Sequence, residues 1–217
     1  TNIISGLTCN AAWVAPIVQN PSPGNPNIFY FGEQHVYKST NKGTSWTMLA
    51  PMGSGGNVNH IAVAVSNTNV IYASRYTSIY QTTNGGTSWN TITGTLPVGS
   101  SQITGIAVDN LNANNVYISL SGYTSGNKVF YSSNGGISWA NYSTGLPNIP
   151  ANCIAFKNNS AGAVYVGTDV GVYYRELSMG SWIPFMTGLT NVIVSDLKVY
   201  YPTGKLRAGT YGRGTWE

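Results

Sequence analysis

Apolar and polar residues alternate with a period of two along most of the chain, in short runs separated by clusters of Asn, Gly, Ser and Pro. Such alternation is typical of strands, and breaks of two to eight polar residues suit hairpins rather than crossover helices. The pattern predicts strands in repeated groups of four, at residues 60–65, 70–74, 78–81 and 88–92, at 103–108, 116–120, 128–132 and 138–142, and again between 152 and 185.

Tryptophan recurs at a regular interval within this pattern. Trp46, Trp89, Trp139 and Trp182 are separated by 43, 50 and 43 residues, and the first three close a segment of the form Ser/Thr-x-Asn-x-Gly-x-Ser-Trp. The segment before Trp182 has lost the Asn and the in-register Gly. A period of this length with four strands per repeat is typical of an all-β β-propeller built from four-stranded antiparallel blades.

The Asn-x-Gly part of the segment predicts a tight turn. An Asn side chain can accept bonds from backbone amides two residues on, and Gly reaches positive φ without strain. A tryptophan at the same height in each blade is expected to join adjacent sheets. We therefore assign a structural role to Asn41, Gly43, Trp46, Asn84, Gly86, Trp89, Asn134, Gly136 and Trp139.

These segments resemble the Asp-box, or BNR, repeat of sialidase-like and xyloglucanase-like propellers, with Asn41, Asn84 and Asn134 where that family has Asp. Residues 166–175 and 204–217 resemble the last blades of large secreted propeller proteins of gliding bacteria. The resemblance implies an extracellular or bacterial cell-surface location and further domains in a larger parent chain. It does not imply one activity, because the repeat occurs in sialidases, xyloglucanases, sortilin-type receptors and adhesion modules.

We expect one domain over residues 1–217, with blades at roughly 8–50, 51–95, 96–146, 147–189 and 190–217. Residues 1–7 match the ends of the predicted outer strands, so the N-terminal strand is expected to complete the last blade and close about five blades into a ring. The alternative is the C-terminal part of a seven- or eight-bladed propeller, which would leave unpaired edges at both ends.

Charged residues make up 7% of the chain, and its ten Lys and Arg against six acids are spread thinly. A nucleic-acid surface needs clustered cations, so we expect no nucleic-acid partner. No apolar run approaches the roughly 20 residues of a membrane-spanning helix, so no membrane insertion is expected. The start at Thr1 lacks an initiator Met and a signal-like segment, which predicts a processed or excised chain.

No cofactor is predicted. Cys9 and Cys153 fit neither a zinc spacing nor a redox pair, and His35 and His60 are too far apart in the pattern to indicate a metal site. No Gly-rich stretch leads from a strand into a helix, so no nucleotide site is expected either.

The loops between second and third strands are the candidate binding surface, because they share one face of the disc while the Trp-capped turns lie on the other. Pockets of propellers form where such loops surround the central channel. The predicted ligand-binding residues on these loops are Gln34, His35, Arg75, Tyr76, Tyr123, Asn127, Asp169, Tyr211 and Arg213.

Aromatic faces beside neutral polar side chains are suited to carbohydrate, and few charges mean little electrostatic steering. The leading hypothesis is a noncatalytic binding module that recognises a glycan or a protein through the loop face. A glycoside hydrolase is the alternative; it needs two carboxylates, and Glu33 and Asp169 are the candidate pair. A sialidase would also need a triad of arginines, and the four arginines of this chain form no visible triad. A purely architectural spacer is the third hypothesis.

Overall fold

A computed structural model describes residues 5–8 and 10–217 of the chain. This part contains strands and turns but no helix, and therefore no helix long and apolar enough to cross a membrane. The strands form five separate antiparallel sheets, arranged as the five blades of a β-propeller. The predicted all-β propeller is therefore confirmed.

Each blade runs from its innermost to its outermost strand in chain order. The first blade holds β1 (Ile17–Gln19), β2 (Phe29–Gly32), β3 (Val36–Ser39) and β4 (Thr47–Met48). The second holds β5 (His60–Val63), β6 (Ile71–Arg75), β7 (Ser78–Thr82) and β8 (Asn90–Thr91). The third holds β9 (Ile103–Val108), β10 (Val116–Leu120), β11 (Val129–Ser132) and β12 (Ala140–Asn141).

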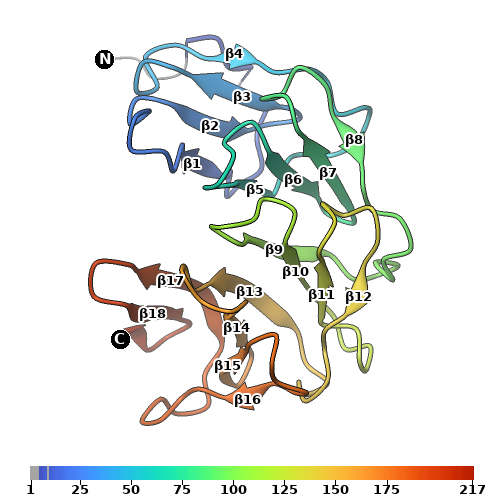
Figure 1. The fold of residues 1–217 in the computed structure, drawn as a ribbon, viewed down its shortest axis with the longest axis vertical. Coiled ribbons are helices and arrows are strands. Elements are labelled where there is room, and N and C mark those ends of the chain that lie inside the picture. Colours follow the sequence, from blue (N-terminus) through green and yellow to red (C-terminus); the bar gives the residue numbers. More distant parts are fainter. Residues whose placement is uncertain (1–4, 9) are drawn as a thin grey trace.

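The fourth blade holds β13 (Ala151–Phe156), β14 (Val164–Thr168), β15 (Gly171–Arg175) and β16 (Ile183–Pro184). The fifth has three described strands, β17 (Val194–Tyr200), β18 (Lys205–Thr210) and β19 (Gly214–Trp216). Figure 1 shows the blades following one another along the chain, from the blue first blade to the red fifth.

The hydrophobic core consists of four clusters, each between two consecutive blades. The second strand of each of the first four blades lies between neighbouring sheets and contributes a buried tyrosine at the same position. These residues are Tyr30, Tyr72, Tyr117 and Tyr165. Since each interface buries apolar side chains from both sheets, blade stacking rather than any single blade provides the stability.

The Trp-capped turns have the predicted tight geometry, with one correction. Asn134 Oδ1 accepts bonds from Ser132 Oγ at 2.8 Å and from the backbone N–H of Ser138 at 3.0 Å, four residues on rather than the expected two. The amide of Asn134 also donates to Ser138 Oγ at 2.8 Å. Asn41 and Asn84 repeat these bonds, so the three turns are built alike.

These turns also join adjacent blades. Gly136, at φ +88°, approaches the outer strand of the preceding blade so closely that a Cβ there would lie 2.4 Å from Ile92 Cδ1. Trp139 donates its Nε1–H to the Ile92 carbonyl at 2.8 Å. Trp182 donates to the Tyr142 carbonyl at 2.5 Å, so the degenerate fourth copy keeps this contact.

The expected closing strand falls largely on residues 1–4, which lie outside the described residues. Ser5 is described, and its carbonyl accepts the backbone N–H of Trp46 at 2.9 Å. Thr144 accepts the N–H of Trp182 at the same distance. Ser5 thus contacts the tryptophan of the first blade in the same way that Thr144, which follows the outer strand of the third blade, contacts the tryptophan of the fourth.

Candidate functional site at the mouth of the central channel

All five loops between second and third strands lie where the innermost strands begin, because each loop is bonded to the segment that leads into its own blade. The amide of Gly32 donates to the Pro16 carbonyl at 3.0 Å and that of Tyr211 to the Ile193 carbonyl at 2.9 Å. The N–H of Tyr76 donates to Asn59 Oδ1 at 2.9 Å. These bonds define one face of the propeller, the loop face.

The Trp-capped turns lie at the opposite ends of the blades. The amides of Gly85 and Gly135 donate to the carbonyls of Asn69 and Asn114, each at 2.9 Å. Asn69 and Asn114 belong to the connections between first and second strands, which leave the innermost strands at their far ends. The geometry therefore separates the turns from the loop face.

A cavity of about 500 Å³ occupies the central channel and is lined by the innermost strands of all five blades. Its apolar lining includes Val14 and Ile17 from the first blade. Val14 is 80% exposed and the adjoining Trp13 is fully exposed, so an apolar edge stands beside the cavity.

Small neutral polar residues surround the cavity at one repeated position. Asn59, Thr104, Asn152 and Ser195 each stand at or just before the beginning of an innermost strand and line the channel. Thr104 donates to the Ala151 carbonyl of the next blade at 2.5 Å. The amide of Asn152 donates to Asp169 Oδ1 at 2.9 Å, which joins this position to the loop of the fourth blade. We call these four residues the polar collar.

Charged and titratable groups are few in the channel. Asp196 and Lys198 lie on β17, with Lys198 Nζ 3.4 Å from Asp196 Oδ1, and both side chains are exposed. Burial lowers the pKa of His60, a hydrogen bond with the Ile103 backbone opposes this, and the Lys198 charge lowers the pKa further. Burial raises the pKa of the Cys153 thiol to about 12, so the thiol is protonated and unreactive at neutral pH.

Three predicted binding residues meet at the junction of the first two blades. Arg75 is 3% exposed and donates to the carbonyls of Gln34 and, at 3.2 Å, Gly53. Its Nη2 also lies 3.2 Å from His35 Nδ1. Burial, and secondarily the Arg75 charge, lowers the pKa of His35. Arg75 thus holds a loop of the first blade to the second, and little of it is accessible to a ligand.

Glu33, the predicted partner of Asp169 in a hydrolase, is 1% exposed. Its Oε2 accepts bonds from the Thr8 hydroxyl at 2.5 Å and from the Thr8 amide at 3.1 Å. The sequence placed Glu33 on a loop tip, but burial and these bonds make it an anchor for the segment before β1. The structure does not bring it together with Asp169.

The other predicted residues are distributed over separate loop tips. Tyr123 is 66% exposed and Tyr211 is 78% exposed. Tyr76 is 45% exposed and has a left-handed backbone, at φ +42°. Arg213 is exposed, whereas Asn127 and Asp169 are half-buried. All lie on the loop face, and none of them lines the central cavity.

The six acids of the chain, all within the described part, do not pair at this cavity. Only Asp196 lines it. Asp109 and Glu176 accept bonds from nearby residues, and Glu217 lies 2.5 Å from Lys205. Residues 5–8 and 10–217 contain no group of three His, Cys, Asp or Glu side chains that could hold a metal ion.

Sequence reasoning missed the polar collar because its residues lie at strand starts and not in loops. The signal is nevertheless present, since aligning the blades places Asn59, Thr104, Asn152 and Ser195 in one column. Each stands two residues before an apolar residue of its innermost strand, namely Ile61, Ile106, Ile154 or Leu197. A comparison of columns across the repeat, rather than a search of loops, would have found them.

No family model matches the chain, and no curated protein matches it. Among solved structures, an ancestral GH74 enzyme shares 25% identity over 95% of this chain, with a TM-score of 0.71. The GH74 xyloglucanase from Xanthomonas campestris shares 16% identity over 98% of the chain, with a TM-score of 0.73. The extracellular domain of BT4673 from B. thetaiotaomicron shares 16% identity over 88%, with a TM-score of 0.65.

The chain spans 28%, 37% and 26% of these three structures, respectively. The two likenesses at 16% identity show the propeller fold alone. These likenesses agree with the propeller fold of this chain.

Proposed function

We propose that this chain is a noncatalytic binding module that recognises a neutral glycan on its loop face, at the mouth of the central channel. The observation that carries the proposal is the polar collar, in which four blades present Asn59, Thr104, Asn152 and Ser195 at one level around the cavity. Neutral amides and hydroxyls are suited to sugar hydroxyls because they both donate and accept hydrogen bonds.

Exposed tyrosines on the loop tips complete this proposed site. Tyr123 and Tyr211 present aromatic faces to solvent on which a sugar ring can stack, while the collar supplies hydrogen bonds. Gln34, His35, Tyr76, Asn127, Asp169 and Arg213 are proposed to form the surrounding surface. The likeness to the extracellular domain of BT4673 supports an extracellular or cell-surface location, as part of a larger protein.

A glycoside hydrolase is the second candidate, and the likeness to the ancestral GH74 enzyme favours it. The arrangement of acids favours binding instead. A hydrolase of the common kind needs two carboxylates facing one bond, and the channel offers only Asp196, already beside Lys198. Glu33 is buried beneath Thr8.

Binding to an array of neutral oligosaccharides tests the proposal. We expect Tyr123→Ala and Tyr211→Ala to weaken binding at least about tenfold, the effect of losing a stacked aromatic ring. Ile137→Ala is the matched control, because Ile137 is 83% exposed on a Trp-capped turn of the opposite face. If the protein binds none of the glycans on the array, the proposal is overturned.

The same glycans separate the two candidates when they are assayed for release of reducing sugar. A binding module leaves them intact. Turnover that disappears in Asp196→Asn, Asp169→Asn or Glu33→Gln would assign the hydrolase instead. Equal loss of binding in Ile137→Ala and Tyr211→Ala would place the site away from the loop face.

A further inference from the structure

One connection on the loop face is longer than the others and ends in a buried lysine. Residues 121–128 join the second and third strands of the third blade, whereas two or three residues make this connection in each of the other blades. Tyr123 lies in this loop and is 66% exposed, while Lys128 is only 1% exposed. A surface loop of this length is expected to be mobile unless other segments hold it.

Lys128 is buried without a carboxylate beside it. None of the ion pairs in the described part of the chain includes Lys128, and its Nζ donates to the Gly122 carbonyl at 2.7 Å. Burial lowers the pKa of Lys128, because the charged form loses hydration. An ammonium in such a place is unfavourable unless hydrogen bonds compensate, so we expect it to have a role that an apolar side chain could not fill.

The bond from Lys128 acts on the peptide unit that leads into Tyr123. This unit contains the Gly122 carbonyl and is planar, so holding its oxygen restricts how the backbone of Tyr123 can turn. Gly122, at φ +88°, lies so close to the segment before β9 that a Cβ would be 2.8 Å from Ser101 Oγ. Near the other end of the loop, the amide of Asn141 donates to the carbonyl of Gly126 at 2.7 Å. The loop is therefore held from both sides.

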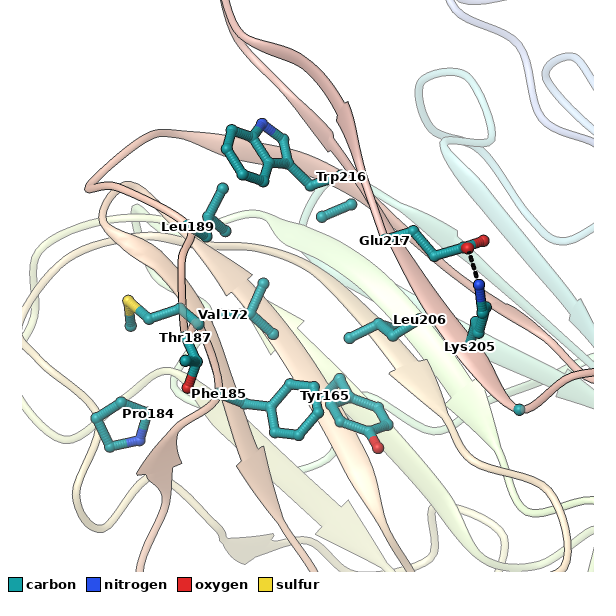
Figure 2. A pocket seen from close by; sticks show the side chains of 13 residues that line it. Tyr165, Val172, Pro184, Phe185, Thr187, Leu189, Lys205, Leu206, Trp216 and Glu217 are labelled. Carbon is teal, nitrogen blue, oxygen red and sulfur yellow. Dashed lines mark hydrogen bonds and ion pairs between the residues drawn. The ribbon is translucent and has the colours of Figure 1, made fainter.

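The surroundings of Tyr123 differ from those of another exposed ring, that of Phe185. Gln102 is exposed and is fixed beside the start of the loop, since its N–H donates to Ser121 Oγ and its carbonyl accepts the Ser121 N–H, each at 2.8 Å. By contrast, Phe185 faces a cavity of about 450 Å³ between the fourth and fifth blades, and Figure 2 shows that the lining is mostly apolar. A ring in a loop beside an exposed amide suits a sugar better than a ring in an apolar cavity.

We propose that Lys128 is a positioning residue for the glycan site of the loop face, which keeps the Tyr123 loop in its binding conformation before the ligand arrives. The inference rests on the proposed function, because it explains how one stacking residue of that site is held in place. A loop that is already ordered loses less conformational entropy on binding, so affinity rises without a new contact. Lys128 itself is buried and does not contact the ligand.

Lys128→Met tests the proposal, because it removes the ammonium and keeps an unbranched side chain of similar length. The ligand is the neutral oligosaccharide that the parent protein binds most tightly on the array. We expect its dissociation constant to rise about fivefold, because the freed loop still visits the binding conformation part of the time. Lys157→Met is the matched control: it removes the same charge at an exposed position outside the loop face and should leave binding unchanged. Urea denaturation checks that both variants fold.

A double-mutant cycle separates positioning from a general structural effect. If Lys128 acts through Tyr123, Lys128→Met should have almost no further effect on binding in a Tyr123→Ala background. In a Tyr211→Ala background it should still weaken binding about fivefold. Asn141→Ala, which frees the other side of the loop at an exposed position, should follow the same rule. Equal effects of Lys128→Met in the two backgrounds would overturn the proposal.

Amide hydrogen exchange in the free protein examines the same loop without a ligand. The N–H groups of Ser121 and Asn127 donate to the carbonyls of Gln102 and Thr124. In Lys128→Met they should exchange at least about tenfold faster, while β10 and β11 stay protected as in the parent protein. If glycans bind but exchange in the loop is unchanged, the role of Lys128 is wrong and the function stands. If exchange accelerates but the parent protein binds no glycan, the proposed function is wrong, and with it any role of Lys128 in binding.

Discussion

Trp182 of the fourth blade donates its indole N–H to the main-chain carbonyl of Tyr142 in the third, at 2.5 Å, and packs edge-on against the Tyr142 ring. Arg175 also lies over the Tyr142 ring, with its guanidinium carbon 3.8 Å from the ring centroid. Tyr142, which directly follows β12, thus contacts the next blade through a hydrogen bond, a ring contact and a cation–π contact. Because the contact crosses between blades, its loss should destabilise the whole array.

Trp182→Ala is expected to lower the free energy of unfolding by about 3–5 kcal/mol, the usual cost of removing a buried tryptophan. Trp182 is 3% exposed, so the substitution leaves a cavity against Tyr142. Urea denaturation followed by circular dichroism measures the effect. Trp13→Ala, at a fully exposed tryptophan, is the control and should change stability by less than about 0.5 kcal/mol. Equal effects of the two substitutions would contradict the assigned role.

Gly136→Ala tests whether the turns need glycine for packing between blades as well as for their backbone conformation. Gly136 and Gly126 both have positive φ, at +88° and +72°, so alanine strains the backbone at either position by about 1 kcal/mol. Only at Gly136 would the new Cβ meet another blade, 2.4 Å from Ile92 Cδ1, whereas Gly126 has no atom within 4 Å. We expect Gly136→Ala to cost about 1–3 kcal/mol more than Gly126→Ala in the same unfolding assay. If the two costs were equal, the contact with Ile92 would have no energetic role.

Asn134→Ala removes the side chain that accepts from Ser132 and Ser138 and donates to Ser138. The expected loss is about 1–2 kcal/mol, because the turn loses its internal bonds. Asn134→Asp keeps both acceptor bonds, and the Ser138 hydroxyl can rotate to donate to it, so this variant should stay within about 0.5 kcal/mol of the parent. Thermal unfolding of the two variants side by side gives the comparison. An aspartate variant as unstable as the alanine variant would show that the donated bond dominates.

The lowered pKa of His60 predicts that stability depends on pH. The ordinary pKa of histidine is 6.5, and burial, with a smaller effect of Lys198, holds the pKa of folded His60 below that value. As the pH falls below about 6.5, the unfolded chain takes up a proton that folded His60 does not, so the free energy of unfolding decreases until the pH reaches the folded pKa. His60→Gln should flatten this part of the profile, measured by urea denaturation between pH 7.5 and 5.

Lys198→Met provides an independent check by NMR titration of His60. Removing the cation takes away one cause of the lowered pKa, so the pKa of His60 should rise toward 6.5 while burial still keeps it below that value. A His60 pKa that does not move would mean that the charge of Lys198 does not reach the imidazole.

Much of the fold could be predicted because its information is local and repeated. Alternation identified the third blade's inner strands at residues 103–108 and 116–120, which are the bounds of β9 and β10. The outer strands were expected to be longer, at 88–92 and 138–142, but β8 and β12 contain two residues each. Each of these short strands begins immediately after its tryptophan, at Asn90 or Ala140, and pairs with the third strand over two residues.

The candidate site was predicted less well. Exposed loop residues such as Tyr123 and Tyr211 were recognised, but Arg75 and Glu33 proved to be anchors, since a charged side chain in a loop can turn inward when carbonyls or hydroxyls meet it. The exposure of the Phe185 ring was not predicted either, because exposure depends on which neighbouring segments pack over a side chain and not on the local sequence pattern.

By itself the sequence determined the strands, the turns and the order of the blades. Each of these depends on side-chain alternation, on Asn and Gly conformation, or on a tryptophan spacing within about 50 residues. Only the tertiary structure decided which residues surround the channel and which surface is left uncovered. Asn59, Thr104, Asn152 and Ser195 lie far apart along the chain and share one level only because five sheets pack around one axis. The repeat places these four residues in one column of the sequence, but only packing between blades brings them together around one cavity.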